Sequence, residues 1–258
     1  MKKILAMLLA LVVVLGLVAC GANEDTAPET TAATTEAATE ATTEAVEDTT
    51  AATEAEVAVM SYAEYKAAEL DAEVVIETYV QNSQSWWEDK ITLYCQDEEG
   101  AYFVYELACS EEDSAKLVPG TKIRITGYKG EWAGEVEIMD GTFEFVEADP
   151  LLVGATDYTE LLGTDEMIEH QNELAAFFGL TVKTIEYKNG EPGDDIYLTL
   201  SKDDKDYNFC VEVYLTGTDS DVYKTVGELK EGDVVDVEGY LYWYEGMNPH
   251  ITSIALAQ

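Results

Sequence analysis

Apolar and polar residues alternate over short stretches from residue 74 onward, and this period of two predicts β-strands with one buried face. Three such stretches come first. An acidic turn at residues 97–100 separates the second from the third, which predicts a hairpin. The three predicted strands are residues 74–80, 91–95 and 102–107.

The same series recurs later in the chain. It comprises residues 174–185, 196–200 and 207–215, with a turn at residues 202–205. Gly179 interrupts the first of these strands and predicts a bulge that bends it. Because a long strand followed by a hairpin occurs twice, we predict two copies of one structural unit.

One further spacing occurs in both copies with every offset preserved. Residues 117–128 and 229–240 both follow the pattern Leu-x-x-Gly-x-x-[Ile or Val]-x-[Ile or Val]-x-Gly-Tyr. The alternating branched residues predict a half-buried strand that is entered from a glycine turn. This is the fourth strand of each copy.

Polar residues also predict short helices, because a serine or threonine followed three residues later by an acid is typical of a helix N-terminus. One helix introduces each copy, and another lies between the third and fourth strands. The predicted N-caps that fit this pattern are Ser61, Ser110 and Thr218, and Thr164 is the predicted cap of the helix that introduces the second copy.

The order strand, hairpin, helix, strand, strand is the plan of the OB-fold, a small five-stranded Greek-key barrel. We therefore predict an all-β protein with short helices and two tandem five-stranded OB-fold-like barrels. The predicted domains are residues 59–149 and 157–258. A hinge at residues 150–156 joins them, where Pro150 and Gly154 interrupt the pattern. A single two-sheet sandwich of ten strands is the alternative architecture.

The N-terminal 20 residues have the pattern of a secretory signal, with Lys2 and Lys3 ahead of an apolar run at residues 4–15. That run is shorter than the roughly 20 residues of a membrane span. Residues 17–21, Leu-Val-Ala-Cys-Gly, resemble the bacterial lipoprotein signal, in which the cysteine is acylated. The resemblance implies lipidation of Cys20 and a lipid-anchored place at the extracytoplasmic face of the cell membrane. An uncleaved anchor is the alternative.

Residues 21–58 are rich in alanine, threonine and glutamate and contain no basic or aromatic residue. Such a segment buries too little surface to offset its ordering entropy, so we predict a disordered tether. Glycosylation of its threonines is the alternative role. With this tether, Cys20 and the repeated Gly-Tyr strands, the chain resembles uncharacterised Firmicutes-type bacterial lipoproteins with tandem OB-fold-like domains. That family implies no activity.

The net charge of the chain limits which partners it is expected to bind. The chain has 53 Asp and Glu against 14 Lys and Arg, a formal net charge of −39. Nucleic-acid affinity comes mainly from Lys and Arg that neutralise phosphates, so the composition predicts against a nucleic-acid partner. Apolar residues still make up 47% of the chain, which is enough for folded cores.

Residues suited to catalysis are few. His170 falls in a predicted helix and His250 at the start of the last strand. Neither has a cysteine or serine in a nucleophile context, so both are interpreted as surface or packing histidines. No Gly-rich phosphate loop, HExxH or paired CxxC is present. We predict no enzymatic activity and no cofactor.

The remaining cysteines are predicted to be free thiols. In the first hairpin Cys95 lies opposite residue 103, which leaves Cys109 roughly 20 Å away and beyond disulfide reach. Cys210 belongs to the other copy. Acidic runs such as residues 203–206 suggest calcium, but they lack the ligand spacing of a calcium loop. We interpret them as solvated surface and predict no metal site.

Aromatic residues gather at the predicted loops at residues 82–88, 129–134 and 242–246. The OB-fold binds ligands on the face of its second and third strands and on the loops joining strands 1–2 and 4–5. Aromatic faces beside carboxylates suit sugar rings or cationic groups. The alternative is that they cap the barrels or pack them together. The candidate ligand-binding residues are Trp86, Trp87, Trp132, Tyr242, Trp243 and Tyr244.

The predicted function is therefore a membrane-anchored, non-enzymatic binding or interaction module for a glycan or a protein. Two alternatives remain open. One is an extracellular hydrolase with an unidentified acidic pair, and the weaker one is a nucleic-acid-binding OB module.

Overall fold

The computed structural model describes residues 58–257, which belong to one compact unit, Thr53–Gln258. The predicted signal, Cys20 and the predicted tether up to residue 57 lie outside the described residues. Within the described range, none of the helices has the length and apolar character needed to cross a bilayer.

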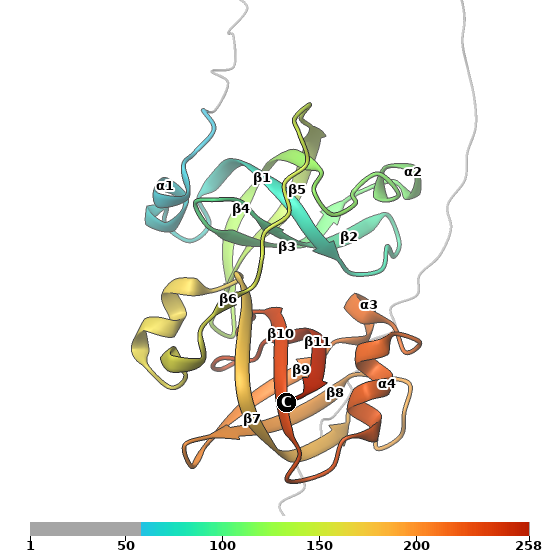
Figure 1. Ribbon diagram of the computed structural model, residues 1–258. Helices are drawn as coiled ribbons and strands as arrows, with labels where there is room; N and C mark the ends of the chain where they lie inside the picture. Colours follow the sequence, from blue (N-terminus) through green and yellow to red (C-terminus); the bar gives the residue numbers. More distant parts are fainter. Residues whose placement is uncertain (1–57, 258) are drawn as a thin grey trace, which may run out of the picture. The chain divides into compact units, whose positions relative to one another are not determined.

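The first half of the described chain forms a closed barrel (Figure 1). Its elements are α1 (Tyr62–Ala67), β1 (Glu73–Ser83), β2 (Lys90–Gln96), β3 (Ala101–Ala108), α2 (Glu111–Ser114), β4 (Lys122–Trp132) and β5 (Glu135–Phe145). The strand order is β1-β2-β3-β5-β4, and only β3 and β5 pair in parallel. This order, with a helix between β3 and β4, is that of an OB-fold-like barrel, so the prediction is confirmed for the first half.

The barrel interior collects the apolar residues from one side of each strand. Leu93 on β2, Val104 on β3 and Ile138 on β5 are all completely buried there. Because successive residues of a strand point to opposite faces, the neighbours of these residues point out of the barrel. Those outward side chains build the site described below.

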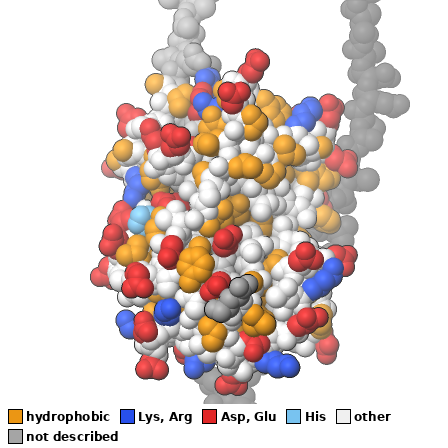
Figure 2. Space-filling view, viewed as in Figure 1, with side chains coloured by type: hydrophobic (Ala, Val, Ile, Leu, Met, Phe, Trp, Pro, Cys, Tyr) orange, Lys and Arg blue, Asp and Glu red, His pale blue; other side chains and the backbone are white. Residues whose placement is uncertain are grey.

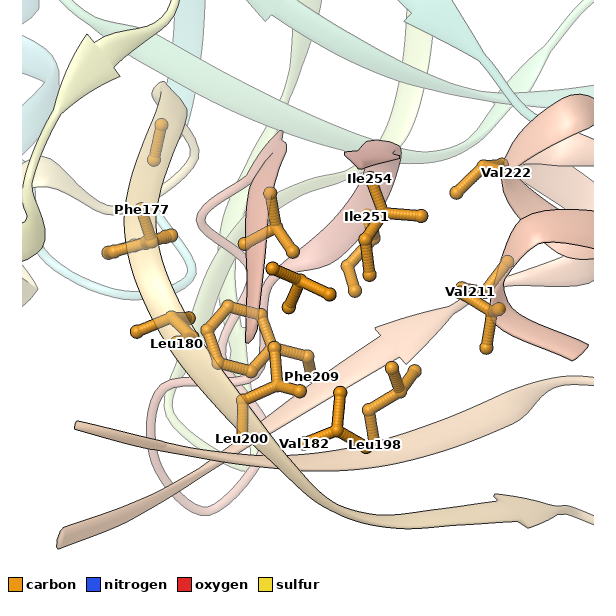
Figure 3. Packing of buried hydrophobic residues seen from close by; sticks show 14 of the residues in the cluster. Phe177, Leu180, Val182, Leu198, Leu200, Phe209, Val211, Val222, Ile251 and Ile254 are labelled. Carbon is orange, nitrogen blue, oxygen red and sulfur yellow. The ribbon is translucent and has the colours of Figure 1, made fainter. Parts of the chain in front are cut away.

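The second half forms a six-stranded sheet in the order β10-β11-β9-β8-β7-β6, and β10 pairs additionally with β7. Its strands are β6 (Thr156–Asp157), β7 (Leu174–Tyr187), β8 (Ile196–Lys202), β9 (Lys205–Val211), β10 (Val234–Tyr240) and β11 (His250–Leu256). Its helices are η1 (Thr159–Leu161), η2 (Asp165–His170), α3 (Val213–Thr216) and α4 (Asp221–Glu228). In its core, Leu180, Leu200 and Phe209 point toward one another, and Val222 of α4 belongs to the same cluster on the side of Ile251 and Ile254 (Figure 3).

The repeated sequence pattern produces the same backbone arrangement twice. Gly120 and Gly232 have φ values of +93° and +91°, a region that favours glycine. The Gly120 N–H donates to the carbonyl of Val80 at 2.7 Å, and the Gly232 N–H donates to the carbonyl of Val182 at 2.9 Å. The strand pairing shifts register directly after each of these valines. The spacing therefore specifies one turn and one bulge in each half.

The local predictions succeed where a side chain fixes the backbone. Ser61 forms the predicted capping box with Glu64, and the Ser110 hydroxyl caps α2. Gly179 (φ +66°) lies where the pairing of β7 with β10 shifts register, which confirms the bulge. Thr164 precedes η2, but its side chain makes no cap hydrogen bond.

Two predictions in the second half are wrong. The strand predicted over residues 207–215 ends at Val211, because the Glu212 side chain accepts a hydrogen bond from the Leu215 N–H and begins α3. The cap predicted at Thr218 belongs to Ser220, whose hydroxyl accepts from the Tyr223 N–H. Serine is at least as good an N-cap as threonine, so the helix begins at Ser220 and not two residues earlier at Thr218.

Candidate ligand-binding site

Two outward-facing aromatic residues of the first barrel begin the site. Tyr94 on β2 and Phe103 on β3 are register partners whose rings lie 5.2 Å apart. They are buried although they face out of the barrel, because aromatic residues of the second half cover them. The Tyr94 ring stacks on Tyr240 at 4.6 Å, and the Phe103 ring meets Tyr242 edge-on at 5.1 Å.

His250 completes this aromatic cluster. Its Nδ1 shares a hydrogen bond of 2.6 Å with the Tyr94 hydroxyl, and its ring stacks on Tyr242 at 4.2 Å. Burial lowers the pKa of His250 to about 3, so the imidazole is neutral at physiological pH. His250 is thus a packing histidine.

Beside this cluster lies a cavity of about 920 Å³ to which both halves contribute. Trp132 at the end of β4 and Tyr244 after β10 lie on its wall, with ring centroids 5.2 Å apart and planes inclined by 40°. Tyr105 on β3 and Tyr197 on β8 add two more exposed aromatic rings. The cavity is therefore walled by aromatic faces contributed by separate strands.

Carboxylates supply the charge of the cavity. They are Glu137, Glu186, Asp195 and Glu212. No lysine or arginine of residues 58–257 lines it. Asp195 is already paired, since it accepts from the Lys188 ammonium at 2.9 Å and from the Val213 N–H at 2.9 Å.

Among the cavity carboxylates that have no hydrogen-bonding or ionic partner, Glu137 is the most buried. It is 5% exposed, and its side chain makes no hydrogen bond or ion pair with any described residue. Burial raises the pKa of Glu137 to about 7. Burial, together with the nearby Asp195, also raises the pKa of Glu212 to about 7.

Glu135 lies two residues before Glu137 and shares its face of β5. It is 0% exposed, and its Oε2 accepts a hydrogen bond of 2.8 Å from the Trp243 N–H. Burial raises the pKa of Glu135 well above its ordinary value. Glu135 therefore joins the two halves next to the cavity, whereas Glu137 faces the cavity itself.

The structure brings together three of the six predicted site residues, namely Trp132, Tyr242 and Tyr244. The predicted loop at residues 129–134 is shorter than expected, because β4 and β5 continue to a two-residue turn at residues 133–134. This hairpin places Trp132 against Tyr244.

The other three lie elsewhere. The Trp86 indole donates to the Cys109 carbonyl at 2.8 Å and packs against the first core. Trp87 is 72% exposed and does not line the cavity. Trp243 packs against the second core. Trp86 and Trp243 thus have the packing role that was the alternative for this set.

Phe103, Tyr105, Tyr197 and Glu137 line the cavity but were not among the predicted residues. The period of two in the hairpins contained a signal for the aromatic ones, since an aromatic residue at an outward position of an OB-fold's second or third strand faces its binding surface. Glu137 had no such signal, because acids are common at outward positions.

The remaining polar groups define no other chemistry. Cys95, Cys109 and Cys210 are buried free thiols, as predicted. Across residues 58–257, no group of three or more His, Cys, Asp or Glu side chains could hold a metal ion. Figure 2 shows the acidic side chains spread over the drawn face of the molecule.

No model of a known family matches the sequence, and no curated protein matches it. Among the solved structures that match, a murine DNA-binding protein bound to double-stranded DNA is 13% identical, with a TM-score of 0.36 over 71% of this chain and 96% of that chain. A HINa domain in complex with a 20-base-pair double-stranded DNA is 10% identical, with a TM-score of 0.33 over 72% of this chain and 100% of that chain. A replication protein A heterotrimer bound to single-stranded DNA is 11% identical, with a TM-score of 0.31 over 72% of this chain and 49% of that chain.

These comparisons contradict the predicted glycan- or protein-binding module, and they contradict the exclusion of nucleic acid as a partner. The three structures named above contain double-stranded or single-stranded DNA. The exclusion rested on the net charge of the whole chain. We therefore withdraw both predictions.

Proposed function

We propose that this chain is a binding protein, not an enzyme, whose cavity holds a flat, ring-containing small molecule. The observation that carries the proposal is the cavity wall, on which Trp132, Tyr244, Tyr105 and Tyr197 present aromatic rings. Such rings bind other flat rings by offset or edge-to-face stacking, at about 0.5–1.5 kcal/mol per pair beyond area burial.

The dimensions and polarity of the cavity support this class of ligand. Its volume of about 920 Å³ falls within the range of roughly 300–1,000 Å³ that is typical of small-molecule sites. Asn208, Thr199 and Asn248 add uncharged polar groups to the aromatic wall. A few convergent polar groups on a mostly apolar wall are what orients a ligand.

The place of the cavity favours a second candidate, an unpaired base of a single-stranded nucleic acid. Phe103 and Tyr105 belong to the outward face of β3, and the second and third strands form the surface on which OB-folds bind oligonucleotides. Unpaired bases stack on exposed aromatic side chains with little regard to sequence. The same wall could hold such a base.

We also propose that the second sheet is a second OB-fold-like barrel. Its pairings repeat those of the first half, since β9 and β11 pair in parallel and β10 pairs with both β11 and β7. For the whole protein, the sequence around Cys20 supports the lipid-anchored, extracytoplasmic place expected of the bacterial lipoproteins that it resembles.

The test is isothermal titration calorimetry of the whole chain with three probes: acridine, adenosine and a short oligothymidine. We expect acridine or adenosine to bind saturably. Trp132→Ala and Tyr244→Ala should each weaken that binding about three- to tenfold, the value of one aromatic contact. Trp87→Ala is the matched control, because it removes an exposed tryptophan outside the cavity.

Saturable binding of oligothymidine alone, lost in the Trp132 and Tyr244 variants, would replace the proposal with the second candidate. Absence of binding by all three probes would overturn both. An equal loss of affinity in Trp87→Ala would place the ring-binding surface outside the cavity.

A further inference from the structure

The charge of the cavity restricts the class of ligand that it can bind, and this inference rests on the proposed function. Strand alternation turns Glu137 out of the first barrel, where solvent would ordinarily surround it. The second half covers it instead, so that 5% of the residue remains exposed. A carboxylate buried in this way without a hydrogen-bonding or ionic partner is unfavourable.

The groups around Glu137 cannot supply the missing positive charge. The cavity carries three further carboxyl groups and no lysine or arginine of the described chain. His250 is neutral, and Lys188 is bound to Asp195. The other titratable groups that face Glu137 or share its surroundings are Tyr65, Tyr105, Tyr197, Tyr242, Tyr244, Glu135, Glu186, Glu212 and Cys210. All of these are neutral or acidic.

Aromatic rings next to unpaired carboxylates form the arrangement that binds organic cations. A cation held over the face of a tryptophan or tyrosine gains about 0.5–2 kcal/mol from the ring quadrupole. Trp132 and Tyr244 offer such faces, and Glu137 offers the counter-charge. A neutral ring would satisfy the aromatic wall but would leave the carboxylate unpaired.

We infer that the cavity selects a flat organic cation, such as a ring carrying an ammonium, amidinium or quaternary nitrogen, with Glu137 as its anionic anchor. The balance is simple. The ligand arrives already charged and pairs with the Glu137 carboxylate. Where Glu137 is protonated in the empty cavity, its O–H proton passes to the buffer. Glu212 is a second carboxyl group on the cavity wall, although its Oε2 already accepts a hydrogen bond of 2.7 Å from the Leu215 N–H.

The raised pKa values of Glu137 and Glu212 agree with this exchange. Both lie at about 7, so a fraction of each carboxyl is protonated at neutral pH in the empty cavity. A bound cation favours the ionised form and lowers both pKa values. The number of protons released should therefore be largest near pH 7 and should fall toward zero above pH 9.

The experiment compares, at pH 7, N-methylacridinium, a permanent cation, with acridine, which has the same rings and is largely neutral at this pH. Calorimetry of the whole chain in two buffers of different ionisation enthalpy counts the protons released. We expect the cation to bind at least about tenfold more tightly than acridine. Glu137→Gln should abolish most of that preference and reduce proton release, while acridine affinity stays within about twofold.

Two further variants keep the result interpretable. Glu212→Gln tests the second carboxyl group if the Glu137 variant does not fold. Glu131→Gln, on the exposed end of β4 and outside the cavity, makes the same charge change and should leave the preference intact.

Equal binding of acridine and N-methylacridinium overturns the cation inference but leaves the proposed function standing. Binding of neither removes both, and a cation preference that survives in Glu137→Gln and Glu212→Gln overturns the assignment of the anchor.

Discussion

The Glu135 carboxylate accepts a hydrogen bond of 2.8 Å from the backbone N–H of Trp243, a residue 108 positions further along the chain. Glu135 is completely buried, and its second oxygen, Oε1, has no partner among the described residues. Asn172 Oδ1 is also buried and unpartnered. A proton on Glu135 would give the side chain a donor, which agrees with the upward shift of its pKa.

The protonation of Glu135 predicts how stability changes with pH. The unfolded chain loses this proton near pH 4.3, whereas the folded protein keeps it to a much higher pH because burial disfavours the charge. The folded state binds more protons over that range, so the contribution of Glu135 to the free energy of unfolding falls as the pH rises. Glu135→Gln should remove this slope. The free energy of unfolding of the variant should therefore rise relative to that of wild type between pH 5 and pH 8.

Urea denaturation of wild type and Glu135→Gln at pH 5, 6.5 and 8 measures the difference. Glu135→Ala leaves the Trp243 N–H without an acceptor and should lower the free energy of unfolding by about 1–3 kcal/mol at pH 5. Because it also removes the titrating group, this deficit relative to wild type should shrink toward pH 8. Glu131→Gln is the exposed control. A wild-type slope that Glu135→Gln leaves unchanged would show that Glu135 ionises normally.

His250 predicts the opposite slope at lower pH. Its pKa is lowered to about 3 by burial, whereas the unfolded chain takes up the proton near pH 6.5. Stability should therefore fall as the pH drops from about 6.5 toward 3, by roughly 1.4 kcal/mol per pH unit for this group. The proton resonances of the His250 ring, followed by NMR, should not shift between pH 8 and pH 5. A titration midpoint near 6.5 would contradict its burial against Tyr94.

The sequence was sufficient for those parts of the fold that one side chain or one turn determines. The Gly-x-x-[Ile or Val] spacing predicted the fourth strand of each half, and Ser61 and Ser110 predicted their caps because these residues act on neighbouring backbone groups. Residues 213–216 were missed because an apolar, aromatic segment after a strand has the same composition whether it extends the strand or forms one helical turn.

The candidate site was only half predictable for a different reason. Alternation could place Tyr94 and Phe103 on the outer face of β2 and β3, but it could not indicate that the second half covers that face. Glu135 and Glu137 occupy outward positions, where an acid ordinarily indicates solvent. Their burial results from contacts between residues far apart in the chain, and strand periodicity contains no information about those contacts.

Lipidation of Cys20 is a prediction from the sequence alone. Cys20→Ala removes the thiol that would be acylated, so the variant should leave the membrane fraction or accumulate as the unprocessed precursor. Detergent partitioning and the electrophoretic mobility of both forms measure this outcome. Cys109→Ala serves as the control, because it removes a buried thiol of the folded part. A Cys20 variant that fractionates like wild type would contradict the lipoprotein prediction.

The paired glycine turns offer a test of the internal repeat that needs no ligand. Gly120 and Gly232 both have positive φ, and each donates its N–H to the carbonyl of a completely buried valine, Val80 on β1 or Val182 on β7. An alanine at either site incurs the strain of that backbone region, about 1–2 kcal/mol.

At Gly232 an added Cβ meets nothing within 4 Å, so Gly232→Ala should show the backbone strain alone. At Gly120 the Cβ would lie 3.0 Å from Pro150, so Gly120→Ala should be the more destabilised variant in urea denaturation. Gly154→Ala, with open space and no positive φ, is the control and should change the free energy of unfolding by less than about 0.5 kcal/mol. If Gly232→Ala behaved like this control, the turn would not need glycine, and the repeated spacing would not be the cause of the shared backbone arrangement.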